Sequence, residues 1–200
     1  MRNKRIIALA GTVALVGVVG VGATLAYFTD TDNTLNTVTM GHVDIDLDEP
    51  IFSAENENNT IENVTPNQTI TKDPTITVKA DSESCYLRAK VQINGLEPNW
   101  DAELLEGINI DDSLWVLSDD GYYYYQYAVG KAGVDQKFKL FDTVTIPEEW
   151  GNEMTDKTFT IGITAEAIQA DNFTPEEANG VITGWVNSEG EDITAETYNE

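Results

Sequence analysis

The sequence predicts a mainly β protein that folds as an antiparallel β-sandwich with one or two short helices. Apolar and polar residues alternate strictly in several short segments, and this is the period of a half-buried strand. About seven or eight such segments follow one another, separated by turn-forming residues. The chain has 200 residues, of which 41% are hydrophobic, so one domain with a sizeable core is expected. Short antiparallel strands in this number are typical of two packed sheets.

Residues 1–26 are predicted to be a signal-peptide helix that precedes the sandwich. Three basic residues come before an uncharged run over residues 6–26, and this pattern predicts export of the remaining chain. The run is long enough to span a bilayer, so a retained membrane anchor is the alternative. Small residues end the run and no basic cluster follows, which favours cleavage between Ala26 and Tyr27.

Residues 27–37 are predicted to be an extended arm. They are rich in Thr, Asp and Asn and begin with the aromatic pair Tyr27-Phe28. A strand follows in which Val43, Ile45 and Leu47 share one face and three aspartates share the other. Pro50 ends this strand, and the Asn- and Glu-rich segment 53–68 is predicted to be a loop.

The middle of the chain supplies further strands. The segment "TITKDPTITVKA" predicts one strand region that a proline interrupts, and "YLRAKVQI" alternates again, with Leu87 and Ala89 on its apolar face. The segment "NWDAELLEGINI" is the central stretch that favours a helical turn or two. The segment "LWVLSDDGYYYYQYAVG" predicts a hairpin with Asp120-Gly121 in its turn.

The last third of the chain continues the strand pattern and then changes. "KFKLFDTVTIP" predicts one further strand, and "KTFTIGITAEAIQA" shows the clearest alternation in the sequence. Thr174-Pro175-Glu176-Glu177 is typical of a helix start, and it predicts a short helix to about Asn179. Residues 38–186 are therefore assigned to the sandwich domain, and residues 187–200 to an acidic tail that is expected to fray.

The run Tyr122, Tyr123, Tyr124 and Tyr125 has two explanations. In strand geometry two of the rings pack inward and two cover the outer face. Alternatively, the four are candidate surface aromatics that form a binding surface.

Charge and cysteine content exclude several classes of function. Acidic residues outnumber basic residues 35 to 11, which opposes binding to nucleic acid or anionic lipid. The single cysteine, Cys85, lies in a strand segment and is predicted to be a small buried thiol without a disulfide partner. A zinc protease of the common type needs His-Glu-x-x-His, but this chain has only His42, predicted to be a lone polar strand residue. We therefore expect no catalytic residues, no metal site and no cofactor.

Several segments resemble the TasA/camelysin (CalY) family of Gram-positive bacteria. The leader ending in "GATLAYFTDTD" and the first strand "TVTMGHVDIDL" are similar to the start of that family. The segment "VTPNQTITKDPTITVKADSESCYLRAKVQI", then "DDGYYYYQYAVG" with "LFDTVTIP", and finally "FTIGITAEAIQADNF" resemble its later strands in the same order. The resemblance covers most of the chain.

The resemblance implies a jelly-roll sandwich that is secreted and assembled into extracellular fibres of a biofilm matrix. A dedicated signal peptidase of the SipW type would cut at Ala26-Tyr27, and the arm of one copy would complete the sheet of the next. The expected arm residues include Tyr27, Phe28, Thr29, Asp30 and Leu35. The implied partners are further copies of this chain and the signal peptidase, with membrane contact only through an uncleaved leader.

Two other functions stay open at this stage. The protein could be a cell-surface binding module or adhesin that uses the tyrosine hairpin. A camelysin-like secreted metallopeptidase is the third alternative, although the chain has no zinc-ligand pattern to support it.

Overall fold

The computed structural model describes residues 42–151, 154, 157–171, 173–186, 189–191 and 193. The predicted signal-peptide helix and cleavage point, the arm and most of the acidic tail therefore lie outside the described residues. The descriptions below concern the unit formed by the residues after Met40.

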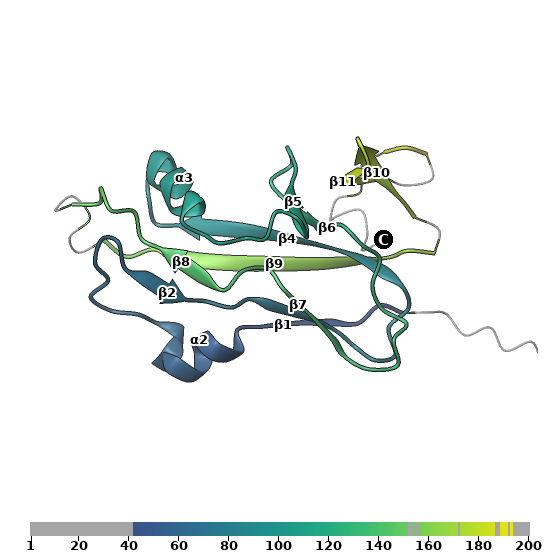
Figure 1. Cartoon of the computed structure of the whole chain (residues 1–200), viewed down its shortest axis with the longest axis horizontal. Helices are drawn as coiled ribbons and strands as arrows, with labels where there is room; N and C mark the ends of the chain where they lie inside the picture. The colour runs from purple at the N-terminus through teal and green to yellow at the C-terminus, as the bar shows by residue number, and fades with distance from the viewer. Residues whose placement is uncertain are drawn as a thin grey trace, which may run out of the picture. The chain divides into compact units, whose positions relative to one another are not determined.

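The longest sheet is built on two ten-residue strands that pair along their whole length. β4 (Cys85–Asn94) and β9 (Thr160–Gln169) are antiparallel, and Cys85 lies opposite Gln169. On its other side β4 pairs with a hairpin, so that the strand order is β5-β6-β4-β9 (Figure 1). The hairpin strands are β5 (Trp115–Leu117) and β6 (Tyr123–Tyr125). Gly121 in the connecting turn has φ 81°, which confirms the predicted turn.

The second layer consists of two smaller sheets. One has the order β1-β3-β7 and the other pairs β2 with β8, all antiparallel. Their bounds are β1 Ile45–Asp48, β2 Thr69–Thr71, β3 Thr75–Val78, β7 Gln136–Lys139 and β8 Thr143–Thr145. Two of the passages between the small sheets are short, one before β3 at Pro74 and one after β7 at Leu140. The proline interruption was predicted, but "KFKLFDTVTIP" was wrongly predicted as one strand.

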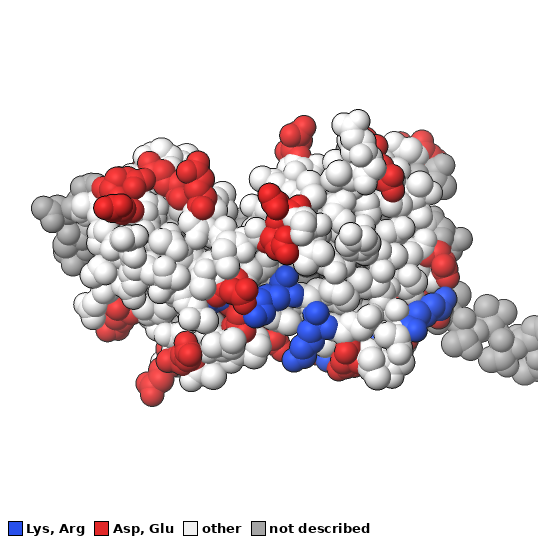
Figure 2. Space-filling view, in the orientation of Figure 1, with Lys and Arg blue, Asp and Glu red and all other residues white. Residues whose placement is uncertain are grey.

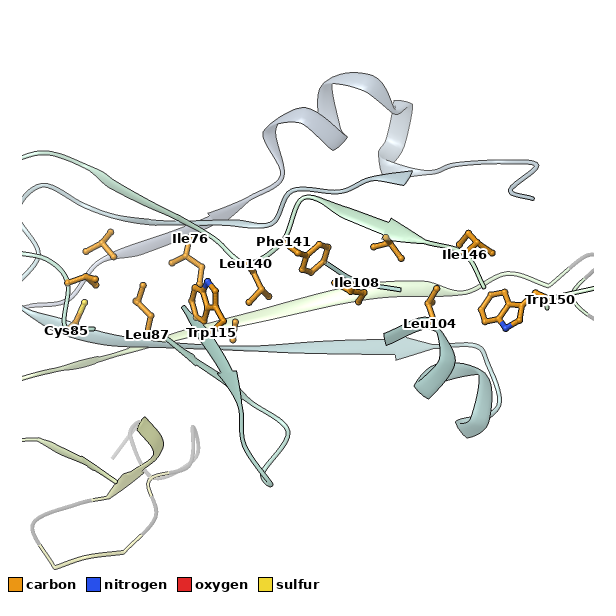
Figure 3. Packing of buried hydrophobic residues seen from close by; sticks show 14 residues of the cluster. Ile76, Cys85, Leu87, Leu104, Ile108, Trp115, Leu140, Phe141, Ile146 and Trp150 are labelled. Carbon is orange, nitrogen blue, oxygen red and sulfur yellow. The ribbon is translucent and has the colours of Figure 1, made fainter. Parts of the chain in front are cut away.

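The main core lies between the two layers. Ile76 and Val78 of β3 pack with Leu87 and Ala89 of β4, and all four side chains have no exposed surface. Figure 3 shows the buried side chains in one row between the layers, from Cys85 at one end to Trp150 at the other. Antiparallel sheets that face each other across such a core form a sandwich, so the predicted fold class is confirmed.

Short helical segments connect some of the strands. α3 (Pro98–Glu106) begins with proline and buries Leu104, and it lies in the segment that the sequence predicted to hold a helical turn or two. α2 (Pro50–Glu55) and a 3-10 turn, η1 (Glu57–Asn59), occupy part of the segment that was predicted as loop. The Asp73 carboxylate accepts hydrogen bonds from the backbone N–H groups of Ile51 and Phe52, and it satisfies free donors of the first helical turn. None of the helices in the described part of the chain is long and apolar enough to cross a membrane.

The predicted helix at residues 174–179 is wrong. Thr174–Ala178 is strand β10, and it pairs with β11 (Val181–Val186) as a hairpin. Asn179 and Gly180 both have positive φ, 55° and 79°, which is the conformation that a two-residue hairpin turn requires. Packing decides against the helix, because Ile182 and Trp185 of β11 bury their side chains against Tyr124 of the long sheet.

The expectation of a frayed tail is wrong at one residue. Ile193 has only 8% of its surface exposed and belongs to the cluster under this hairpin. Its backbone N–H donates a hydrogen bond to the carbonyl of Trp185. The C-terminal hairpin and Ile193 thus form a second, smaller core on the outer face of the long sheet.

Candidate functional site

On one side of the sandwich, each of the two layers ends in an outer strand. β1 is the outer strand of its sheet and β9 is the outer strand of the long sheet, and the two strands lie in contact. Among the described residues, no strand pairs with the other side of either one. We call the strip along these two strands the seam, defined by Val43, Ile45, Leu47, Ile161, Ile163, Ala165 and Ala167.

Toward the seam, the backbone of β9 presents a row of groups that pair with no strand among the described residues. The N–H of Ala170 donates to the carbonyl of Ser84, which sets the hydrogen-bonded positions of this ladder at even-numbered residues of β9. The odd-numbered residues from Ile161 to Gln169 therefore direct their N–H and C=O groups away from β4. Such an edge is a template on which a further strand can pair.

The apolar side chains of the seam are incompletely buried although they face the core. Leu87 and Ala89 of β4 have no exposed surface, whereas Ile161 and Ile163 on the same face of β9 are only half-buried. On β1, Leu47 has 38% of its surface exposed. The alternation that the sequence predicted for both strands is present, but along the seam its apolar face is still partly open to solvent.

The opposite side of the sandwich is closed by direct contacts between the layers. The indole N–H of Trp115 donates to the carbonyl of Lys139 at 2.9 Å, which ties β5 to β7. Tyr125 packs its ring against Phe138 with centroids 5.1 Å apart. The contrast between the two sides makes the seam the candidate site for adding a strand.

The tyrosine run divides between the two faces of the long sheet. Tyr123 and Tyr125 pack against the main core, whereas Tyr122 and Tyr124 face the C-terminal hairpin. The prediction of a surface aromatic is wrong for Tyr124, which has 1% of its surface exposed, and the other three are half-buried. Alternation along β6 is as expected, but β11 covers the outer ring.

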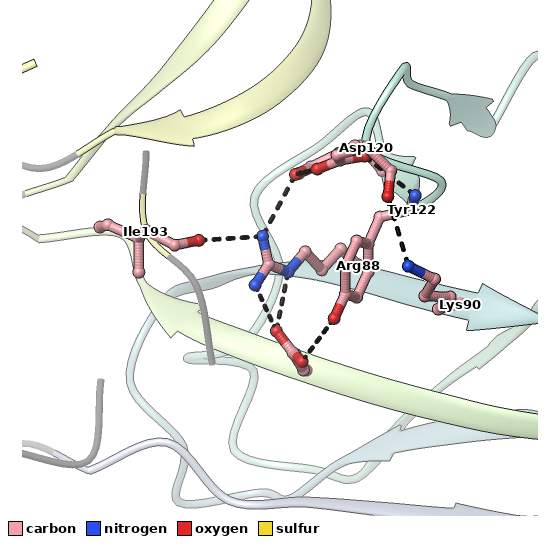
Figure 4. A network of polar contacts seen from close by, with 7 residues as sticks. Arg88, Lys90, Asp120, Tyr122 and Ile193 are labelled. Atoms are coloured by element: carbon pink, nitrogen blue, oxygen red, sulfur yellow. Dashed lines mark hydrogen bonds and ion pairs between the residues drawn. The ribbon is translucent and has the colours of Figure 1, made fainter. Parts of the chain in front are cut away.

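A buried arginine organises this outer face (Figure 4). Arg88 lies on the polar face of β4, has 3% of its surface exposed and binds the Glu166 carboxylate of β9 at 2.8 Å through Nε and 2.5 Å through Nη2. Its Nη1 donates to the Tyr124 hydroxyl and to the Ile193 carbonyl, each at 3.2 Å. The guanidinium also stacks between the rings of Tyr122 and Trp185, at 4.2 and 4.4 Å from their centroids.

The ionisation of these groups follows from burial and their partners. Burial opposes the charged form of Arg88, but hydrogen bonds from it to Tyr124 and Glu166 outweigh this, so its pKa lies above the ordinary value. Burial, together with the hydrogen bond to Asp120, raises the pKa of Tyr124 well above its usual range. Arg88 is therefore a permanent cation with its charge neutralised by Glu166. The sequence pattern did not indicate this network, because Arg88 sits where alternation predicts a solvent-exposed residue.

A hollow of about 630 Å³ lies between the two hairpins above this network. Trp185 and Tyr122 contribute aromatic surface to its lining, and Leu117 is an exposed apolar residue there. Asp119 and Glu176 also line it and are exposed, so the hollow carries negative charge. Its size is typical of small-ligand sites.

Cys85 is buried as the sequence predicted, whereas the prediction of His42 as a strand residue is wrong. Cys85 has no exposed surface, and burial raises the pKa of its thiol to about 11, so it stays protonated and unreactive at neutral pH. His42 precedes β1 and is exposed, with Nε2 3.4 Å from a carboxylate oxygen of Asp81.

The fold and the seam define a class of protein, namely an antiparallel β-sandwich with one open side. Comparison with known proteins adds the family. Residues 2–111, more than half of the chain, match the family described as camelysin metallo-endopeptidase, and the chain belongs to this family. No curated protein and no solved structure matches the chain.

The family description implies a metal, so the available ligands matter. The whole sequence holds one histidine and one cysteine, and that cysteine is buried in the core. In the described ranges no three His, Cys, Asp or Glu side chains are grouped closely enough to hold a metal ion. Zinc proteases bind their metal through three protein ligands, usually with two histidines from one helix. The residues in the described part of the chain do not fit such a site.

Proposed function

We propose that this protein is a secreted structural subunit of extracellular matrix fibres, in which residues 27–37 of one copy add as a strand to the seam of the next. The observation that carries the proposal is the seam itself. It combines a ten-residue strand edge, which no strand in the described part of the chain pairs, with apolar side chains that face the core and yet remain half-exposed. A strand added there would pair the backbone groups of β9 and cover these side chains.

The length of the arm fits this edge. Eleven residues in extended conformation span about 36 Å, and the ten residues of β9 span about 33 Å. The polarity of the arm fits as well. Tyr27, Thr29 and Leu35 share one face with no charged residue, whereas Asp30 and Asp32 lie on the other face. Facing the uncharged side inward avoids burying a carboxylate next to Ile161 and Ile163.

The leader determines when this assembly can begin. While residues 1–26 remain attached, the arm is held at the membrane, and cleavage between Ala26 and Tyr27 frees it. Strand donation controlled by cleavage gives the leader and the arm each a role, and it requires no catalytic site in the folded domain.

The test compares protein that starts at Tyr27 with protein that starts after Thr37. We expect the longer form to assemble into fibres and the shorter form to stay a folded monomer. Circular dichroism reports folding, analytical ultracentrifugation reports mass, and electron microscopy reports fibres. Fibres from the shorter form would overturn the proposal.

A surface binding module is the second candidate function, and the hollow between the hairpins is the observation that favours it. The protein that starts at Tyr27 and the protein that starts after Thr37 both keep the hollow. Ligand binding by the longer protein while it stays a monomer would favour this alternative. Peptidase activity is the third reading, which the family description suggests. Casein digestion with and without a chelator separates that reading from the other two.

A further inference from the structure

The position at which the arm leaves the domain restricts how it can add to β9. The backbone N–H of Glu83 donates to the carbonyl of His42, and the N–H of Ala170 donates to the carbonyl of Ser84. His42 and the Gln169 end of β9 therefore lie at the same end of the sandwich. The chain before His42 emerges at that end, far from Thr160.

This placement limits what a copy can do with its own arm. From Thr37 to His42 the chain spans at most about 18 Å, whereas β9 is about 33 Å long. An arm on its own β9 must therefore run toward Gln169, parallel to that strand. An arm that runs antiparallel to β9 has to come from another copy, because its own connection is too short to return along the strand.

The direction of the added strand also decides the symmetry of the assembly. With parallel addition, the donor's body sits at the Gln169 end, where the acceptor's own arm emerges. Two copies can then exchange arms and close as a two-fold dimer. With antiparallel addition, the donor's body sits at the Thr160 end, and the acceptor's arm remains free for a third copy. This arrangement continues as a filament and offers no reciprocal exchange that closes a dimer.

Resting on the proposed function, we infer that the arm of a neighbouring copy adds antiparallel to β9, with Tyr27 at the Gln169 end and Thr37 at the Thr160 end. Antiparallel ladders are slightly more stable per residue than parallel ones. In this direction Tyr27 lies opposite Gln169 and next to the small residue Ala167, and Leu35 lies opposite Ile161.

Antiparallel addition also places the body of the donor copy on a particular surface of the acceptor. The Thr160 end of β9 adjoins Gly95, since a Cβ on Gly95 would lie 2.7 Å from the carbonyl oxygen of Thr158. Helix α3 begins three residues after Gly95, at Pro98. The body of the donor copy therefore meets the α3 end of the acceptor with its own His42 end.

Disulfide trapping in mixed fibres tests the direction. One protein carries Thr160→Cys as acceptor, and a second carries either Asn36→Cys or Phe28→Cys as donor, each with Cys85→Ala to remove the native thiol. Thr160 is exposed. In an added strand whose odd-numbered residues face the core, Phe28 and Asn36 would fall on the outward face. Because each chain carries one cysteine, any disulfide between acceptor and donor joins two copies, and a different mass tag on each protein identifies it.

Antiparallel addition predicts an acceptor–donor disulfide with Asn36→Cys and none with Phe28→Cys. The reverse result would overturn the inferred direction while leaving strand donation intact. Fibres that form without either disulfide would show that β9 is not paired in this way. Absence of fibres from the parent protein starting at Tyr27 would instead overturn the proposed function.

Discussion

At the scale of single residues, Arg88 shows how a charge is kept inside this fold. Its guanidinium has lost nearly all contact with water, and it is compensated by one carboxylate, two further acceptors and two aromatic faces. A buried ion pair of this kind adds little net stability by itself, but breaking it leaves an unpaired charge. Arg88 instead joins β4 to β9, to the tyrosine hairpin and to Ile193.

Replacing Arg88 alone should therefore cost more than replacing the pair. We expect Arg88→Met to lower the free energy of unfolding by about 3 kcal/mol or more, because Glu166 is left without its cation. The double variant Arg88→Met/Glu166→Met should recover much of that loss, and exposed Lys137→Met should change little. Urea unfolding measures all three. A double variant as unstable as the single one would contradict this explanation.

At the scale of elements, the sequence predicted one of the two hairpins and not the other. Asp120-Gly121 lies between aromatic and apolar residues, and the turn was predicted. Asn179-Gly180 is an equally good turn, but the segment before it has the composition of a helix start. The hydrophobic contacts of β11 with Tyr124 and Ile168 decide the outcome, and these depend on residues far away in the sequence.

The C-terminal turn should be sensitive to its backbone conformation. Gly180 has φ 79° with open space around its Cβ position, so Gly180→Ala should cost about 1–2 kcal/mol through strain alone. Gly162→Ala in β9 is the matched control, since its Cβ would meet nothing closer than 3.8 Å and the backbone needs no positive φ. We therefore expect Gly180→Ala to lower the free energy of unfolding more than Gly162→Ala does. Equal stability of both would argue against a strained turn.

At the scale of the whole molecule, charge opposes the association of copies. The net charge is −24, and removing residues 1–26 takes away three more basic residues and no acidic one. On the face shown in Figure 2, acidic side chains gather over α3, which the inferred stacking brings next to another copy. His42 at the other end is accompanied by the acidic residues Asp81 and Glu83. Like charges at both contacting ends repel each other, and salt weakens that repulsion.

Fibre assembly should therefore depend on ionic strength. We expect slow assembly near 10 mM salt, where charges act over about 30 Å, and faster assembly near 150 mM, where they act over about 8 Å. Light scattering follows the rate and electron microscopy identifies fibres. Glu97→Gln/Glu106→Gln at the α3 end should lower the salt requirement more than Asp119→Asn/Glu176→Gln at the hollow. Assembly insensitive to salt would refute this electrostatic picture.

By itself, the sequence determined the strand content, the faces of most strands, the buried cysteine and the resemblance to the camelysin family. These follow from local alternation and from motifs that are read along the chain. The tertiary structure alone decided that residues 174–178 form a strand, that Arg88 is buried and that the apolar face along β9 stays partly open. Each of these depends on which distant segment lies beside the residue in question, and a pattern read along one strand carries no information about the neighbour that covers it.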